Sequence, residues 1–118
     1  MIDEALRGVR GESQGVDAVL LAGIDGVLVA TSGTAEDLAA DAIAAAFADL
    51  FRKVGAAHRE AGLPAPSEFT AGGPRYRVVV RAVTDDYLLL AVLSDRGIVG
   101  QARHALTRAA LRLEAELA

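Results

Sequence analysis

The sequence contains no cysteine, and aromatic residues make up only 4% of its 118 residues. Without cysteine, disulfides, thiol catalysis and thiolate metal sites are excluded. No apolar run approaches the roughly 18 residues that a membrane-spanning helix needs, so we expect no direct membrane insertion. The first residues, Met1–Glu4, lack the basic and then apolar pattern of a signal peptide. We therefore expect a cytoplasmic protein.

Basic residues are outnumbered by acidic ones, 12 against 16, which gives a net charge of −4. General nucleic-acid binding is not expected, because a phosphate backbone attracts a basic surface. Apolar residues make up 53% of the chain, which is typical of a folded protein rather than a disordered one. The length corresponds to a single domain over residues 1–118.

Motifs of catalytic and ligand-binding proteins are missing. His58 and His104, the two histidines, have no ligand-type residue at i+4, so we expect no metal site. Ser32-Gly33-Thr34 lacks the spacing and the lysine of a phosphate-binding loop. Asp85 and Asp86 are adjacent in a turn, whereas general acid–base chemistry needs carboxylates opposed across a cleft. We expect no catalytic, cofactor-binding or metal residues, no cofactor and no enzymatic activity.

The strongest structural signal is a pair of apolar segments. Tyr87–Leu93 is apolar throughout, which predicts a central strand covered on both faces. In the preceding segment, 76–83, Tyr76, Val78 and Val80 alternate with more polar positions, as in a strand with one buried face. Thr84–Asp86 joins the two as a hairpin loop.

Around this hairpin the pattern predicts three helices, about 1–12, 35–61 and 98–117, and three further strands, 16–24, 27–31 and 68–71. Asp25-Gly26 predicts a type I′ hairpin turn. Thr34, with Asp37, and Asp95 are the predicted helix caps. The expected fold is an α/β (α+β) sandwich with the order helix-strand-strand-helix-strand-strand-strand-helix. Its five-stranded antiparallel sheet carries the long middle helix on one face and the terminal helices on the other.

The predicted helices carry apolar stripes. In the last helix the stripe contains Ile98, Ala102, Leu106, Ala109, Leu113 and Leu117. In the long helix we assign to the sheet a stripe of Ile43, Phe47, Leu50, Val54, Ala57 and Ala61. Its opposite side is rich in alanine, including Ala48, and only lightly charged. Alanine is the best helix former, so this side is either simply helical or a second contact face.

The chain resembles the Roadblock/dynein light-chain family, and its free-standing bacterial members of the MglB type above all. The resemblance rests on Gly15–Leu21 running into Asp25-Gly26, on the Ala-rich helix, on the strand pair 76–83 and 87–94, and on Gly97. It implies a dimer whose sheets join edge to edge, with the long helices side by side. It also implies a non-enzymatic scaffold or regulator of a small Ras-like GTPase, with activation of that GTPase among the possible roles. The alternative is a small-molecule-sensing or general interaction module of the profilin or longin type.

Three groups of residues are the candidates for contacts with partners. The edge strand that would pair with a second copy contains Phe69, Thr70 and Ala71. The outer face of the long helix, offered to the second copy or to the GTPase, contains Leu38, Ala42, Ala45, Asp49, Arg52 and Ala56. Arg75, Arg77 and Arg81 share one face of their strand, where they either cover the sheet and pair with carboxylates or bind an anionic partner.

Overall fold

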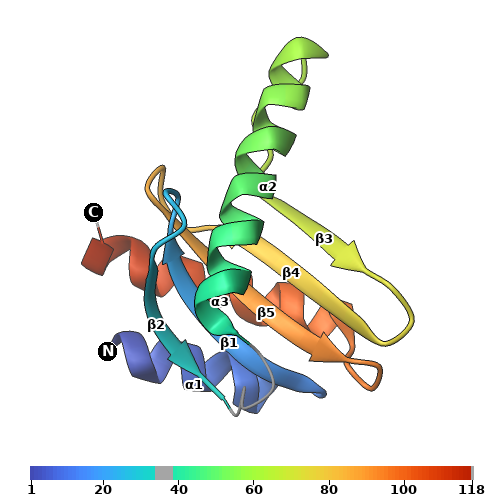
Figure 1. Ribbon diagram of the computed structural model, residues 1–118. Helices are drawn as coiled ribbons and strands as arrows, with labels where there is room; N and C mark the ends of the chain where they lie inside the picture. Colours follow the sequence, from blue (N-terminus) through green and yellow to red (C-terminus); the bar gives the residue numbers. More distant parts are fainter. Residues whose placement is uncertain (34–38, 118) are drawn as a thin grey trace.

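The computed structural model describes residues 1–33 and 39–117, and it has the predicted order of helices and strands (Figure 1). The elements are α1 (Ile2–Glu12), β1 (Val16–Gly23), β2 (Leu28–Ser32), α2 (Ala40–Glu60), β3 (Glu68–Gly72), β4 (Tyr76–Ala82), β5 (Tyr87–Ser94) and α3 (Val99–Leu117). The predicted α+β sandwich with its five-stranded antiparallel sheet is confirmed.

The strands lie in the order β2-β1-β5-β4-β3, so β5 is the central strand. Its position follows from its composition, because a strand that is apolar on both sides must be covered on both faces. Leu89 and Leu90 are both fully buried, and they point into opposite cores. The prediction that Tyr87–Leu93 forms the centre of the sheet is confirmed.

The molecule has three layers, and a hydrophobic core lies on each face of the central sheet. The first core lies between the sheet and the pair α1 and α3, and Leu6, Leu106 and Leu113 belong to it. The second core lies between the sheet and α2, and its fully buried helical residues are Ala44 and Ala48. Figure 1 shows α2 alone on one side of the sheet, with the terminal helices behind it and the last turns of α2 projecting beyond the sheet.

The turns and helix ends differ from the predictions. Gly26 has a positive φ of 93°, whereas Asp25 has none, so the β1–β2 turn is not of type I′. Asp25 instead accepts a hydrogen bond from the Val27 N–H (3.1 Å), which holds the turn locally. Helix α3 begins at Val99, too far along the chain for Asp95 to cap it, and Ile98 is exposed rather than buried.

Helix α2 also begins later than predicted. Its first residue is Ala40 and its N-cap is Ala39, which makes no side-chain capping bond. The predicted cap Thr34 and its companion Asp37 lie outside the described residues.

Candidate protein interface along strand β3 and helix α2

Strand β3 is an edge of the sheet, with β4 on one side of it and no further strand on the other in the described part of the chain. The Ala82 N–H donates to Ser67 and the Gly73 N–H donates to Tyr76, both at 2.9 Å. In an antiparallel pair, hydrogen-bonded residues alternate with residues whose backbone groups point away. Since Ser67 and Gly73 are bonded to β4, the backbone groups that point out of the open edge are those of Glu68, Thr70 and Gly72.

An aromatic cluster marks the place where α2 crosses this edge. The Phe69 ring stacks on Phe47, with centroids 6.4 Å apart, and on Phe51, at 6.0 Å. These are the three phenylalanines of the sequence, and none of them is fully buried. Large aromatic rings usually contribute most to the stability of a protein when they are buried in a core. Here they lie at the seam between a helix and an unpaired strand.

One side of α2, which we call the apolar flank, lies next to this cluster. It contains Ile43, Leu50, Val54 and Ala57, which share the stripe of Phe47 at helical spacing. We predicted that this stripe faces the sheet, but that prediction is wrong in part, because Leu50 is 38% exposed and Ala57 is exposed. Since the rings of Phe47 and Phe51 stack on Phe69 of β3, the apolar flank faces the β3 side of the molecule.

The sheet-facing surface of α2 consists of smaller residues. Ala44 and Ala48 are fully buried, although Ala48 was predicted to lie on the outer side. Small side chains at these two positions let the helix axis approach the sheet closely. The larger apolar residues are thereby turned toward the helix sides. The sequence signal for the cluster was the pair Phe47 and Phe51, four residues apart on one helix, and Phe51 was missed.

The opposite side of α2, which we call the polar flank, contains Asp49, Arg52 and Lys53, and it faces the β1–β2 hairpin. A side-chain carbon added at Gly26 would lie 3.2 Å from Ala45 Cα, so the hairpin turn packs against the helix. Arg52 donates to the carbonyl oxygen of Ile24. Asp49 forms ion pairs with Lys53 (2.9 Å) and Arg52 (3.4 Å). The hydrogen bond and the charge of Lys53, followed by the charge of Arg52, hold the pKa of Asp49 below its usual value.

The remaining candidates on the outer face lie around these residues. Ala42 is exposed and Ala56 is half-buried, whereas Leu38 lies outside the described residues. The predicted outer face is therefore the polar flank and its surroundings, and it points away from β3.

The three arginines of the β4 region have different surroundings. Arg75 is exposed just before the strand. Arg77 donates to the carbonyl oxygen of Gly97 (2.8 Å), and Arg81 lies 3.6 Å from Glu68. Glu68 also pairs with Arg103 of α3, and this carboxylate raises the pKa of Arg103. Two of the three candidate arginines thus have partners within the chain, beneath α3.

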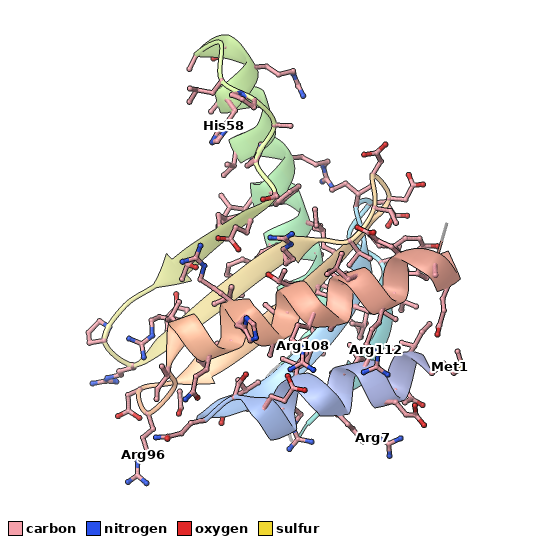
Figure 2. The ribbon with its side chains drawn as sticks, turned by 180° about the vertical axis from the view of Figure 1, so that it is seen from behind. Met1, Arg7, His58, Arg96, Arg108 and Arg112 are labelled. Atoms are coloured by element: carbon pink, nitrogen blue, oxygen red, sulfur yellow. The ribbon has the colours of Figure 1, made fainter. Side chains whose placement is uncertain are left out.

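The histidines are placed apart. His58 Nδ1 donates to the carbonyl oxygen of Pro64 (3.0 Å), which fastens the chain leaving α2 to the helix end (Figure 2). His104 is exposed on α3. Within residues 1–33 and 39–117, no group of three histidine or carboxylate side chains could hold a metal ion.

None of the helices described is both long enough and apolar enough to cross a bilayer.

Comparisons of structure place this fold among Roadblock/LC7 domains. The structure is similar to Myxococcus xanthus MglB, with a TM-score of 0.89 and 16% identity over 98% of this chain and 94% of that one. It is similar to an MglB with a tetrameric arrangement (TM-score 0.88, 21% identity, 97% and 85% of the two chains). It is also similar to a Roadblock/LC7 domain from Streptomyces avermitilis (TM-score 0.88, 15% identity, 98% and 96%). The chain has a Roadblock/LC7 fold of the MglB type.

Other comparisons are less informative. An Acanthamoeba castellanii profilin II matches with a TM-score of 0.59 and 25% identity over 98% of this chain and 94% of that one, so the profilin-like alternative is a weaker match. No protein-family model and no curated protein matches the sequence.

Proposed function

We propose that this protein is a non-enzymatic homodimer that regulates or scaffolds a small Ras-like GTPase. The proposed dimer rests on one observation, which is that two surfaces without a partner in the described chain lie next to each other on one side of the molecule. The open edge of β3 presents backbone donors and acceptors, and the apolar flank of α2 lies directly beside it. Unpaired strand edges invite pairing with another chain.

A two-fold axis beside β3 satisfies both surfaces at once. Two β3 strands pair antiparallel, and the outward backbone groups of Thr70 meet those of the second copy. The same operation brings the two apolar flanks together on one face of a ten-stranded sheet, where Leu50 and the phenylalanine cluster lose their exposure. The MglB with a tetrameric arrangement supports self-association as a property compatible with this fold.

The polar flank is then the surface left for the GTPase. It lies on the far side of each α2 from the dimer seam, and it carries Asp49, Arg52 and Lys53 in an exposed ion-pair group. The similarity of fold to MglB structures and the family resemblance of the sequence support a Ras-like GTPase as the partner. Fixed charges on a helix outer face favour a specific docking orientation.

The dimer is tested by light scattering at micromolar concentration. We expect a particle of twice the chain mass. Leu50→Arg places a charge in the apolar flank and should yield monomers. Leu111→Arg makes the same change at another exposed leucine, on α3, and should leave the dimer intact.

Thr70→Pro provides the strand test. It removes an N–H that points out of the sheet, so the chain should fold and yet fail to dimerise. A folded wild-type monomer, or a Leu50→Arg protein that dimerises like wild type, would disprove the proposed seam.

The GTPase is tested by affinity capture from the native cell in the presence of GDP or a non-hydrolysable GTP analogue. We expect a Ras-like GTPase to be retained in one nucleotide state, and its GTP hydrolysis rate to change on addition of the dimer. Asp49→Lys should abolish capture while the protein remains dimeric. Capture that is independent of nucleotide, or unaffected by Asp49→Lys, would argue against this partner and surface.

A further inference from the structure

Two large apolar side chains are exposed at opposite ends of β3. Leu63, in the segment between α2 and β3, is 54% exposed, and Tyr76, at the start of β4, is 52% exposed. Tyr76 alternates along β4 with Val78 and Val80, which belong to the core beneath α2, so its ring lies on the α2 face of the sheet. The core of a single chain uses neither Leu63 nor Tyr76.

Leu63 belongs to the projecting end of α2. Figure 1 shows the last turns of α2 extending beyond the sheet, and Figure 2 shows His58 on this part of the helix. The chain then returns along the helix, because the Leu63 N–H donates to the His58 carbonyl oxygen (2.8 Å) and His58 Nδ1 donates to the Pro64 carbonyl oxygen (3.0 Å). We call residues 57–64 the α2 tip. Its exposed apolar residues are Ala57, Ala61, Leu63 and Pro64.

The proposed dimer brings the two ends of β3 together. If two β3 strands pair antiparallel about Thr70, Glu68 of one copy lies opposite Gly72 of the other. A two-fold axis perpendicular to the sheet also keeps both α2 helices on the same face. The α2 tip extends past the Glu68 end of β3, and the β3–β4 turn follows Gly72. The tip of each chain therefore lies over the β3–β4 turn of the other.

The area of the seam is a reason to expect this additional contact. Strand β3 has five residues, and the apolar flank adds Leu50, which is 38% exposed. A stable protein interface buries roughly 1,200–2,000 Å² in total. Burial of a leucine and a tyrosine at each end of the seam extends a short interface toward this size.

The charges at the two surfaces are complementary. The β3–β4 turn carries Arg75, which is exposed, and no carboxylate. The α2 tip is the C-terminal end of a helix, where the helix dipole is negative and favours a cation. Arg59 and Glu60 on the tip balance each other, as do Asp95 and Arg96 in the loop after β5. The remaining charges are the positive one of Arg75 and the negative end of the helix dipole.

We infer that each α2 tip binds the β3–β4 turn of a second copy, with Leu63 packed against the ring of Tyr76 and Arg75 beside the end of the helix. The inference rests on the proposed dimer. It adds to that dimer a reciprocal contact at each end of the seam, which a single chain cannot make.

The absence of cysteine from the sequence allows a direct test by disulfide formation. A Leu63→Cys chain is mixed with a Tyr76→Cys chain, left to exchange subunits and oxidised. A disulfide needs Cα atoms within about 7 Å of each other, so we expect a linked heterodimer, identified by mass spectrometry of the joined peptides. Either chain oxidised alone should remain unlinked, because identical positions lie at opposite ends of the seam. Leu63→Cys mixed with Leu111→Cys, at an exposed leucine of α3, should also remain unlinked.

The dissociation constant of the dimer, measured by analytical ultracentrifugation, provides the second test. Leu63→Ser and Tyr76→Ser should each weaken the dimer about tenfold, because each removes one side of an apolar contact. The double variant should be weakened by less than the product of the two single effects, since both residues belong to one contact. Leu111→Ser is the control and should dimerise like wild type. Circular dichroism of each variant checks that the fold is unchanged.

The outcomes separate this contact from the dimer itself. A wild-type dimer that forms no disulfide between positions 63 and 76, or forms it no better than the Leu111→Cys control, would overturn the inference and leave the dimer standing. Wild-type affinity in both serine variants would do the same, and it would leave the two side chains to a partner of another kind. A wild-type monomer would disprove the dimer and this contact together.

Discussion

At the scale of single residues, one close backbone contact that involves two glycines joins the start of β1 to the entry of α3. Gly15 has a positive φ of 74°, and a side-chain carbon there would lie 2.4 Å from Gly97 N. The Gly15 carbonyl oxygen accepts the Ser94 N–H (2.9 Å) across the same junction. The sequence resemblance rested partly on Gly15 and Gly97. The close contact of these two chain segments explains why glycine occurs at both positions.

Gly15→Ala should accordingly be strongly destabilising. The left-handed conformation and the steric overlap together should lower the free energy of unfolding by roughly 2–4 kcal/mol. Gly8→Ala is the matched control, since Gly8 lies inside α1 and, beyond its chain neighbours and the helix backbone, an added carbon would meet no atom within 4 Å. That substitution should raise stability by about 0.5–1 kcal/mol. Urea denaturation of both variants measures the difference, and equal stabilities would contradict the contact.

The charge group on the polar flank yields a pH prediction. The pKa of Asp49 is lowered from its ordinary value of 3.8, chiefly by Lys53. A carboxyl whose folded pKa is depressed stabilises the fold above its unfolded pKa, and this contribution is lost as the pH falls through the folded pKa. We expect an NMR titration of the Asp49 carboxyl carbon to have its midpoint below 3.8. Lys53→Met should move that midpoint upward, and an unchanged midpoint would show that Lys53 is not the cause.

At the scale of elements, β5 determines whether the sheet forms. Leu90 is fully buried in the core beneath α2, and burial of one leucine contributes ~1.5–3 kcal/mol. Leu90→Asp should prevent folding, because a buried carboxylate without a partner is not compensated. Leu111→Asp, at an exposed leucine, should melt close to wild type. A soluble Leu90→Asp protein with a cooperative thermal transition would contradict the central position of β5.

The elements differed in how well the sequence predicted them, and the physical reasons can be given. Strand β5 was predicted correctly because an all-apolar strand can be stable only at the centre of a covered sheet. The order of elements and the two covered faces followed from the same argument. The β3 segment was correctly placed as short, and its position at the edge agrees with the prolines on either side of it.

Helix α2 was predicted less well because an apolar stripe does not indicate what covers it. Leu50 and Ala57 have the spacing of core residues, yet the sheet lies against Ala44 and Ala48. Alanine occurs on several sides of the helix, so composition could not distinguish the face in contact with the sheet. The pairing of Arg52 with the Ile24 carbonyl joins residues 28 apart in sequence, and no local pattern indicates such a contact.

At the scale of the whole molecule, the two open edges of the sheet have different surroundings. Beside β3 lie exposed apolar residues of α2 and an aromatic cluster, whereas charged residues of both signs lie near β2, with Asp25 in the turn before it and Arg7 of α1 beside Thr31 and Ser32. Pairing two chains through β3 leaves the two β2 edges outermost, one at each end of the continuous sheet.

The proposed dimer makes thermal stability depend on protein concentration, because association favours the folded state by mass action. A tenfold increase in concentration adds about 1.4 kcal/mol per dimer. For two chains of this length that corresponds to a rise in Tm of about 3–5 °C. Thr70→Pro removes the outward N–H of β3 while leaving every bond to β4 in place, so its transition should be lower and independent of concentration. Differential scanning calorimetry over a hundredfold range of concentration measures both. A wild-type Tm that stays constant over that range would show that folding is not coupled to dimerisation, and the role proposed for the β3 edge would then be wrong.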